Sequence, residues 1–195
     1  MSFLVTVERK NMKKLLKKRE YELICKVRIR GLRPLLHHNP AGVIVQGPSK
    51  GTKVYLPEEE VRKALYLGSD EKPYQPAGHL EGAMVKAAVQ HKYAGKKTYK
   101  DLFNSRIWVT PEEIPLGGDW VTDARGAIVN RSRITRWRPR WDNWELEFEV
   151  HSDDPEIQPL IIKEVFGTAG RIGIGDFRPK YGIFEVVSFD IIQES

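Results

Sequence analysis

Cysteine is nearly absent from this chain of 195 residues, which contains Cys25 alone. A single thiol forms no internal disulfide and supplies no multi-thiolate zinc site, so a disulfide scaffold and a zinc ribbon are both excluded. No apolar run approaches the roughly 20 residues that a transmembrane helix needs, and no charged-then-apolar signal segment opens the chain. We therefore expect a cytoplasmic protein without a membrane partner.

Motifs for metal binding and for common enzyme classes are also missing. The five histidines lack ligand spacing, and His79 with Glu81 lacks the second histidine of a zincin helix. No Gly-Lys-Ser/Thr follows a glycine cluster, which excludes a P-loop, and no nucleophile elbow supports a Ser-His-Asp hydrolase. We expect neither a bound metal nor a cofactor.

The composition is that of a globular domain with an excess of basic charge. Hydrophobic residues make up 41% of the chain and charged residues 30%, which suits one core in a domain of ~100–200 residues. Six Lys and Arg side chains lie between Lys10 and Arg19, so residues 1–19 are expected to form a basic N-terminal arm or short helix. Residues 20–195 then form the domain. The net charge of +6 favours polyanionic partners.

Periodicity along the chain predicts an alternation of strands and helices. Strands are predicted at residues 21–30, 105–110, 127–137, 144–150 and 183–192. Helices are predicted at residues 57–67, 79–93 and 159–167, the last stopping at Gly167 or Gly170. The strongest elements follow the order β-α-β-β-α-β. This order predicts an α+β, ferredoxin-like (RRM-like) antiparallel sheet, with an insertion at about residues 35–75 after the first strand.

Charge is distributed unevenly between residues 125 and 156. Six arginines and no acid lie from Arg125 to Arg140, whereas seven acids and no Lys or Arg lie from Asp142 to Glu156. A basic strand beside an acidic strand allows favourable cross-strand charge pairs. We therefore predict that strands 127–137 and 144–150 pair as a hairpin.

The basic part of this region also carries tryptophans. Arginines can contact phosphates, and indole rings can stack on exposed bases for roughly 1–3 kcal/mol each. The residues predicted to contribute in this way are Arg133, Arg136, Arg138, Trp137 and Trp141. Trp144 lies on the apolar register of its strand, so it is predicted to belong to the core.

A glycine-rich segment before the last strand is the second candidate site. Five glycines between residues 167 and 182 permit close backbone approach and exposed N–H groups. The glycines expected to shape this loop are Gly170, Gly173, Gly175 and Gly182. Arg171, Arg178 and Lys180 supply positive charge for phosphates, and Phe177 and Tyr181 either stack on bases or pack under the loop. The alternative is a purely structural connection.

The element order and the glycine-rich segment together resemble the RAMP superfamily of CRISPR effector complexes. The chain is also similar to phage and prokaryotic proteins that share an early Leu-His-His/Asn-Pro loop, here Leu36 to Pro40, and a late segment, here Gly170 to Phe184. The resemblance implies binding to RNA or single-stranded nucleic acid. Some members of the superfamily are backbone subunits and others are endoribonucleases.

We therefore expect a protein that binds single-stranded RNA or DNA and lines up along the strand, as a homo-oligomer or within a larger nucleoprotein assembly. One alternative is a metal-independent endoribonuclease in which His37 or His38 moves the 2′-hydroxyl proton. Another is an assembly protein whose basic face docks on an acidic protein partner. The sequence does not distinguish RNA from DNA.

Overall fold

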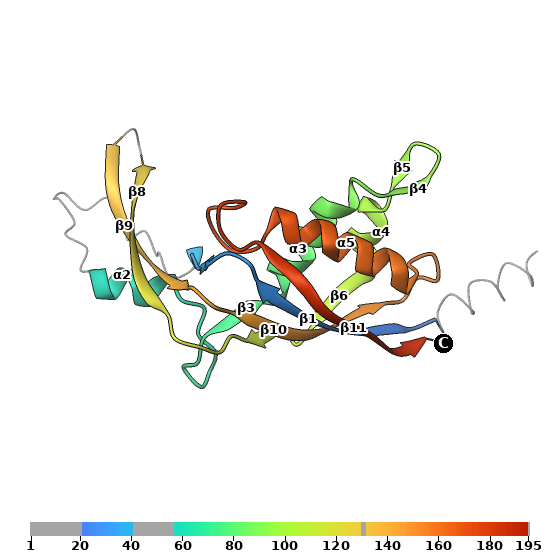
Figure 1. Ribbon diagram of the computed structural model, residues 1–195, viewed down its shortest axis with the longest axis horizontal. Helices are drawn as coiled ribbons and strands as arrows, with labels where there is room; N and C mark the ends of the chain where they lie inside the picture. Colours follow the sequence, from blue (N-terminus) through green and yellow to red (C-terminus); the bar gives the residue numbers. More distant parts are fainter. Residues whose placement is uncertain (1–20, 41–56, 130–131, 195) are drawn as a thin grey trace, which may run out of the picture.

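A computed structural model describes residues 21–40, 57–129 and 132–194, and in this part of the chain the main sheet has four antiparallel strands in the order β11-β1-β10-β6. They are β1 (Leu23–Gly31), β6 (Ile107–Thr110), β10 (Glu145–Ser152) and β11 (Phe184–Glu194). Helices α3 (Ala77–Ala88) and α5 (Pro159–Ile172) pack on one face of the sheet (Figure 1). The order along the chain is β-α-β-β-α-β, so the predicted α+β, ferredoxin-like fold is confirmed.

The core lies between the sheet and these two helices. In β1 the buried side chains are Leu23, Cys25, Val27 and Ile29, and they alternate with exposed Lys26, Arg28 and Arg30. This period of two directs one face of the strand toward the helices, where burial of each aliphatic side chain contributes about 1.5–3 kcal/mol. Trp144 is buried as predicted, and its indole N–H donates a hydrogen bond of 2.9 Å to the Arg33 carbonyl oxygen.

A long hairpin between β6 and β10 replaces the predicted one. Strand β8 (Val121–Val129) pairs with β9 (Ser132–Trp141), and β9 also pairs with the short strand β2 (Leu35–Leu36). The prediction that strand 127–137 pairs with strand 144–150 is wrong, because β1 and β6 already occupy the two edges of β10. The β8–β9 hairpin extends away from α3 and α5 at one end of the molecule (Figure 1).

Smaller elements fill the connections. They are α2 (Pro57–Ala64), β3 (Tyr74–Pro76), β4 (Lys92–Ala94), β5 (Lys97–Thr98), α4 (Lys100–Arg106) and β7 (Glu113–Pro115). Strand β3 pairs with β7, and β4 pairs with β5. Helix α2 lies beside the β8–β9 hairpin, which places one side of the predicted insertion next to the basic strand (Figure 1).

Three helix ends differ from prediction. Helix α2 ends at Ala64 instead of residue 67, and α3 ends at Ala88 instead of residue 93, where the chain turns into the β4–β5 hairpin. Helix α5 does not stop at Gly167 or Gly170 but continues to Ile172. A Cβ atom at Gly170 would overlap the Phe184 carbonyl oxygen, so this glycine allows α5 to approach β11 rather than ending the helix.

Parts of the predicted organisation lie outside the described residues. These are the basic segment at residues 1–19 and the stretch 41–56 of the predicted insertion. In the part of the chain that the structure describes, no helix is both long and apolar enough to cross a bilayer.

Candidate nucleic-acid interface

The glycine loop (Gly173–Gly182) connects α5 to β11 and folds against the β1–β2 connection. The Asp176 N–H donates to the Leu36 carbonyl oxygen at 2.9 Å. Gly175 has a φ of +75°, and a Cβ atom there would lie 2.6 Å from the same Leu36 oxygen, so the position requires glycine. Positive φ angles also occur at Gly173 and Gly182. The loop therefore has one well-defined backbone path, which fixes where its side chains emerge.

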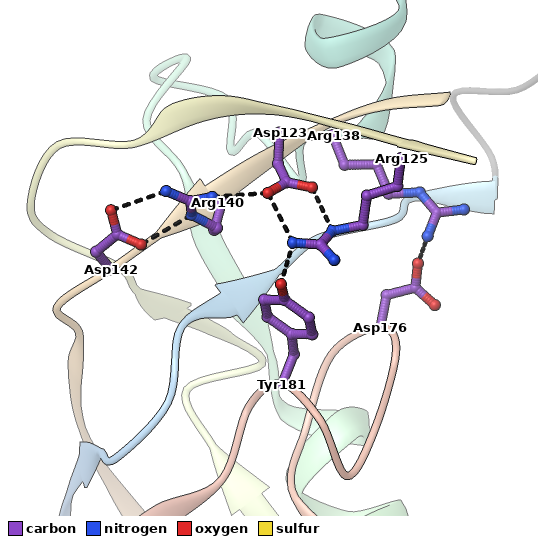
Figure 2. Close-up of polar contacts among 7 residues, drawn as sticks. All are labelled: Asp123, Arg125, Arg138, Arg140, Asp142, Asp176 and Tyr181. Atoms are coloured by element: carbon purple, nitrogen blue, oxygen red, sulfur yellow. Dashed lines mark hydrogen bonds and ion pairs between the residues drawn. The ribbon is translucent and has the colours of Figure 1, made fainter. Parts of the chain in front are cut away.

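The β8–β9 hairpin contacts this loop through two arginines (Figure 2). Arg125 of β8 donates a hydrogen bond to the Tyr181 hydroxyl, and its guanidinium carbon lies 4.4 Å from the centre of the Tyr181 ring. Arg138 of β9 forms an ion pair with Asp176, and its guanidinium carbon lies 5.1 Å from the centre of the Phe177 ring. Two segments far apart in the sequence thus form one surface.

A buried carboxylate joins the two strands of the hairpin. Asp123 is 6% exposed, and its Oδ2 accepts hydrogen bonds from Arg125 at 2.9 Å and Arg140 at 2.7 Å (Figure 2). Burial alone would raise the pKa of Asp123, but the hydrogen bonds from these two guanidinium groups outweigh it and hold the pKa below its usual value. Arg140 also donates to Asp142 at 2.8 Å. Asp123 is therefore ionised and neutralises part of the arginine charge.

The arginines predicted to form a phosphate track have acidic neighbours. Arg136 pairs with Glu60 of α2 at 3.0 Å, and Arg138 pairs with Asp176. Burial lowers the pKa of Arg138 from its ordinary value. The side chain of Arg133 lies outside the described residues. Contacts between these arginines and phosphates stay a prediction, and for Arg136 and Arg138 such contacts would compete with carboxylates.

Basic charge without a described acidic partner gathers around a hollow beside the glycine loop. The hollow has a volume of about 550 Å³. The charged and aromatic side chains that line it are Lys86, Arg171, Asp176, Phe177 and Arg178. Within the described part of the chain, no acidic side chain forms an ion pair with any of its three cations. Lys180, on the same loop, is exposed.

The structure brings together three predicted residues, Arg171, Phe177 and Arg178, and adds two that the sequence analysis did not select. Lys86 comes from α3, and its place against the loop depends on helix packing that no local sequence pattern reveals. Asp176 belongs to the glycine loop. It is the one acid in the basic segment from Gly170 to Phe184, and this feature of the sequence could have identified it.

The four predicted stacking residues differ in exposure. Phe177 is 39% exposed beside the hollow, so it can accept a base on its ring. Tyr181 is 9% exposed and packs under the loop, which is the alternative that the sequence left open. Trp141 is fully buried, so the prediction that it stacks on bases is wrong. Trp137 is half-buried and stays a prediction.

The two candidate catalytic histidines occupy different environments. His37 is fully buried against the Trp141 ring, and its Nε2 lies 3.0 Å from Gln75 Oε1. Burial lowers the pKa of His37 to about 3, so the ring is neutral near pH 7 and has no access to a substrate. The alternative in which His37 moves the 2′-hydroxyl proton is therefore wrong. His38 is exposed, and burial of part of its ring, followed by the nearby Arg138 and Arg136, lowers its pKa.

Gln75 connects His37 to a second histidine. Its Nε2 lies 2.7 Å from His79 Nδ1, and the Tyr66 hydroxyl lies 3.4 Å from His79 Nε2 and donates to the His38 carbonyl oxygen at 3.0 Å. This chain of hydrogen bonds ties the Leu-His-His-Asn-Pro segment to the start of α3. Among the described residues, no cluster of three or more His, Cys, Asp or Glu side chains could hold a metal ion.

Comparison with known proteins gives a structural relative. No family model and no curated protein matches the sequence. A chain in a cryo-EM structure of the Type III-B Cmr-beta complex bound to cognate target RNA is similar, with a TM-score of 0.54 and 15% identity. The similarity covers 98% of this chain and 67% of that chain. At this identity the match supports the ferredoxin-like fold.

Proposed function

We propose that this protein binds single-stranded nucleic acid at the glycine loop, as a RAMP-like subunit of a nucleoprotein assembly. The hollow beside the loop carries the proposal, because Lys86, Arg171 and Arg178 surround it and the Phe177 ring lies next to them. Cations of this kind bind phosphates, and an exposed aromatic ring offers a stacking surface.

The presence of Phe177 among the cations favours a single strand over a duplex. In a duplex the base faces are stacked on one another, so a ring at the protein surface has no base face to contact. In a single strand, one base can turn toward Phe177 while the neighbouring phosphates contact Arg171 and Arg178. A single strand therefore uses both features of the hollow.

The structural relative supports the same proposal. It belongs to a complex that was solved bound to cognate target RNA, and it shares the fold along nearly the whole of this chain. The motifs that resemble RAMP proteins lie in the glycine loop, which is also where the cations gather. Motif and charge thus point to one region.

Salt dependence of binding provides the test. If Lys86, Arg171, Arg178 and Lys180 each contact a phosphate, a plot of log affinity against log salt concentration should have a slope of about −3. Fluorescence anisotropy with labelled U15 and dU15 oligonucleotides measures this slope. The double variant R171A/R178A should bind more weakly and reduce the magnitude of the slope by about 1.4, because two contacts are removed.

Two lysines that do not line the hollow give a matched control. Lys92 of β4 and Lys97 of β5 are exposed, and K92A/K97A removes the same charge as R171A/R178A. This control should keep the parent slope. If the parent binds neither oligonucleotide at low salt, the proposed function is wrong and docking on an acidic protein partner takes its place. Equal slopes for the parent and R171A/R178A would place binding elsewhere.

A further inference from the structure

Asp176 is an acid in a hollow whose other charged side chains are all basic. It lines the hollow together with Lys86, Arg171 and Arg178, and its side chain is 30% exposed. A carboxylate at this position repels phosphates, so it weakens binding of a polyanion unless the ligand offers it a hydrogen-bond donor. We therefore expect a ligand in this hollow to place a hydrogen-bond donor next to the Asp176 carboxylate.

The orientation of Asp176 is fixed from two sides. Its backbone N–H donates to the Leu36 carbonyl oxygen at 2.9 Å, and its Oδ2 atom is buried in the ion pair with Arg138 (Figure 2). Arg138 is itself held over the Phe177 ring. With Oδ2 occupied in this way, the exposed edge of the carboxylate is its Oδ1 side. A hydrogen-bond acceptor of this kind is positioned before any ligand arrives.

The sugar–phosphate backbone of a nucleic acid offers one kind of donor. Phosphate, ester and ring oxygens only accept hydrogen bonds, whereas the ribose 2′-hydroxyl also donates. DNA lacks this group. In a hollow whose cations track the backbone, the one backbone donor that an acceptor can meet is therefore the 2′-hydroxyl, and donors on the bases are shared by RNA and DNA.

We infer that Asp176 accepts a hydrogen bond from the 2′-hydroxyl of a nucleotide in the hollow and so selects RNA over DNA. This inference rests on the proposed function. With RNA, the charge-assisted hydrogen bond offsets the repulsion between Asp176 and the phosphates. With DNA, the repulsion stays without compensation, and we expect binding about tenfold weaker than that of RNA.

Three oligonucleotides test the inference in an anisotropy assay. U15 and dU15 carry the same uracil base and differ only at the 2′ position, so their affinity ratio reports on the sugar. U15 with 2′-fluoro substitution keeps an RNA-like sugar but has no 2′ donor. For the parent protein we expect dU15 and the 2′-fluoro strand to bind about tenfold more weakly than U15.

Two variants remove the acceptor. D176A deletes the carboxylate, and D176N keeps an oxygen for Arg138 but turns an amide donor toward the hollow. Both should bring the ratio of U15 to dU15 affinity close to one, with tighter binding of dU15 than in the parent. If D176A fails to fold, D176N decides. A parent ratio near one, or an unchanged ratio in D176N, overturns the inference.

Asp142 supplies the matched control. It is an acid that pairs with an arginine, Arg140, as Asp176 pairs with Arg138, but it does not line the hollow. D142N should keep the parent ratio of U15 to dU15 affinity. A ratio near one in D142N would overturn the inference, because the loss of any acid would then change the ratio. If the parent protein binds none of the three oligonucleotides, the proposed function itself is contradicted. An unchanged ratio with normal U15 binding contradicts only the role of Asp176.

Discussion

Two basic regions of this molecule differ in what surrounds their charges. On the face of the sheet away from the helices, Lys26 and Arg30 of β1 pair with Glu147 and Glu185 on the neighbouring strands, each at 2.6 Å. Around the glycine loop, Lys86, Arg171 and Arg178 line a hollow with one acid, Asp176. In the first region the two cations are paired across the strands, whereas in the second the three cations outnumber the one acid.

This difference distinguishes the sheet face that the fold leaves open from the surface that we propose to bind nucleic acid. RNA-recognition motifs bind their ligand on the open face of a ferredoxin-like sheet. Here the same face carries paired charges, and three cations that form no ion pair with another described residue lie at the junction of α3, α5 and the glycine loop. A shared sheet order therefore does not determine which surface binds, and the distribution of ion pairs is the better guide.

The largest expected effect comes from Gly175→Ala, which changes the loop backbone without changing charge. The new Cβ atom would meet the Leu36 carbonyl oxygen, and the positive φ disfavours alanine. We expect the free energy of unfolding to fall by about 3 kcal/mol, measured by urea denaturation. RNA binding should fall as well, because Phe177 and Arg178 follow directly in the chain.

Gly82 of α3 gives the control for this change. A Cβ atom there meets nothing within 4 Å, and alanine favours a helix, so Gly82→Ala should leave stability equal or raise it by up to about 1 kcal/mol. If Gly175→Ala were as stable as the parent, the loop would not be fixed in the conformation that positions the hollow.

A smaller effect is expected in the pH dependence of stability, through the buried ring of His37. The unfolded chain binds a proton at His37 near pH 6.5, whereas burial keeps the folded ring neutral down to about pH 3. Stability should therefore decrease as pH falls below 6.5, by about 2 kcal/mol between pH 7 and pH 5. Denaturation at both pH values should show a loss about 2 kcal/mol larger in the parent than in His37→Gln, because His38 and His79, whose pKa values burial also lowers, are present in both proteins. Equal losses in both proteins would show that His37 is accessible to protons in the fold.

The strands of the main sheet could be predicted because they obey local rules. In β10, and in β1 from Cys25 onward, apolar residues alternate with polar or charged ones, and the burial follows the same alternation. The partner of β9 could not be predicted from charge. Glu147 of β10 pairs with Lys26 of β1. The arginines of the β8–β9 hairpin pair with Asp123 of β8 itself, with Asp142 directly after β9, and with Glu60 and Asp176 from distant segments.

The candidate site was predictable where its residues are neighbours in sequence. Arg171, Phe177 and Arg178 share one short segment, so their proximity follows from the chain itself. Lys86 lines the hollow only because α3 packs beside α5. Trp141 is buried because β9 pairs with β2 and its ring packs against His37. Both facts depend on tertiary packing, which periodicity does not encode.

The smallest expected effect tests the open face directly. The double variant K26A/R30A removes two positive charges, as R171A/R178A does, but these charges are exposed and paired with glutamates. Exposed ion pairs contribute about 0–1 kcal/mol each, and at 0.1 M salt a charge is screened beyond about 10 Å. We expect U15 affinity within about twofold of the parent and a salt slope that does not change. If K26A/R30A instead weakens binding as much as R171A/R178A, the nucleic acid lies across the open face as in RNA-recognition motifs. The glycine loop would then be a structural connection between α5 and β11.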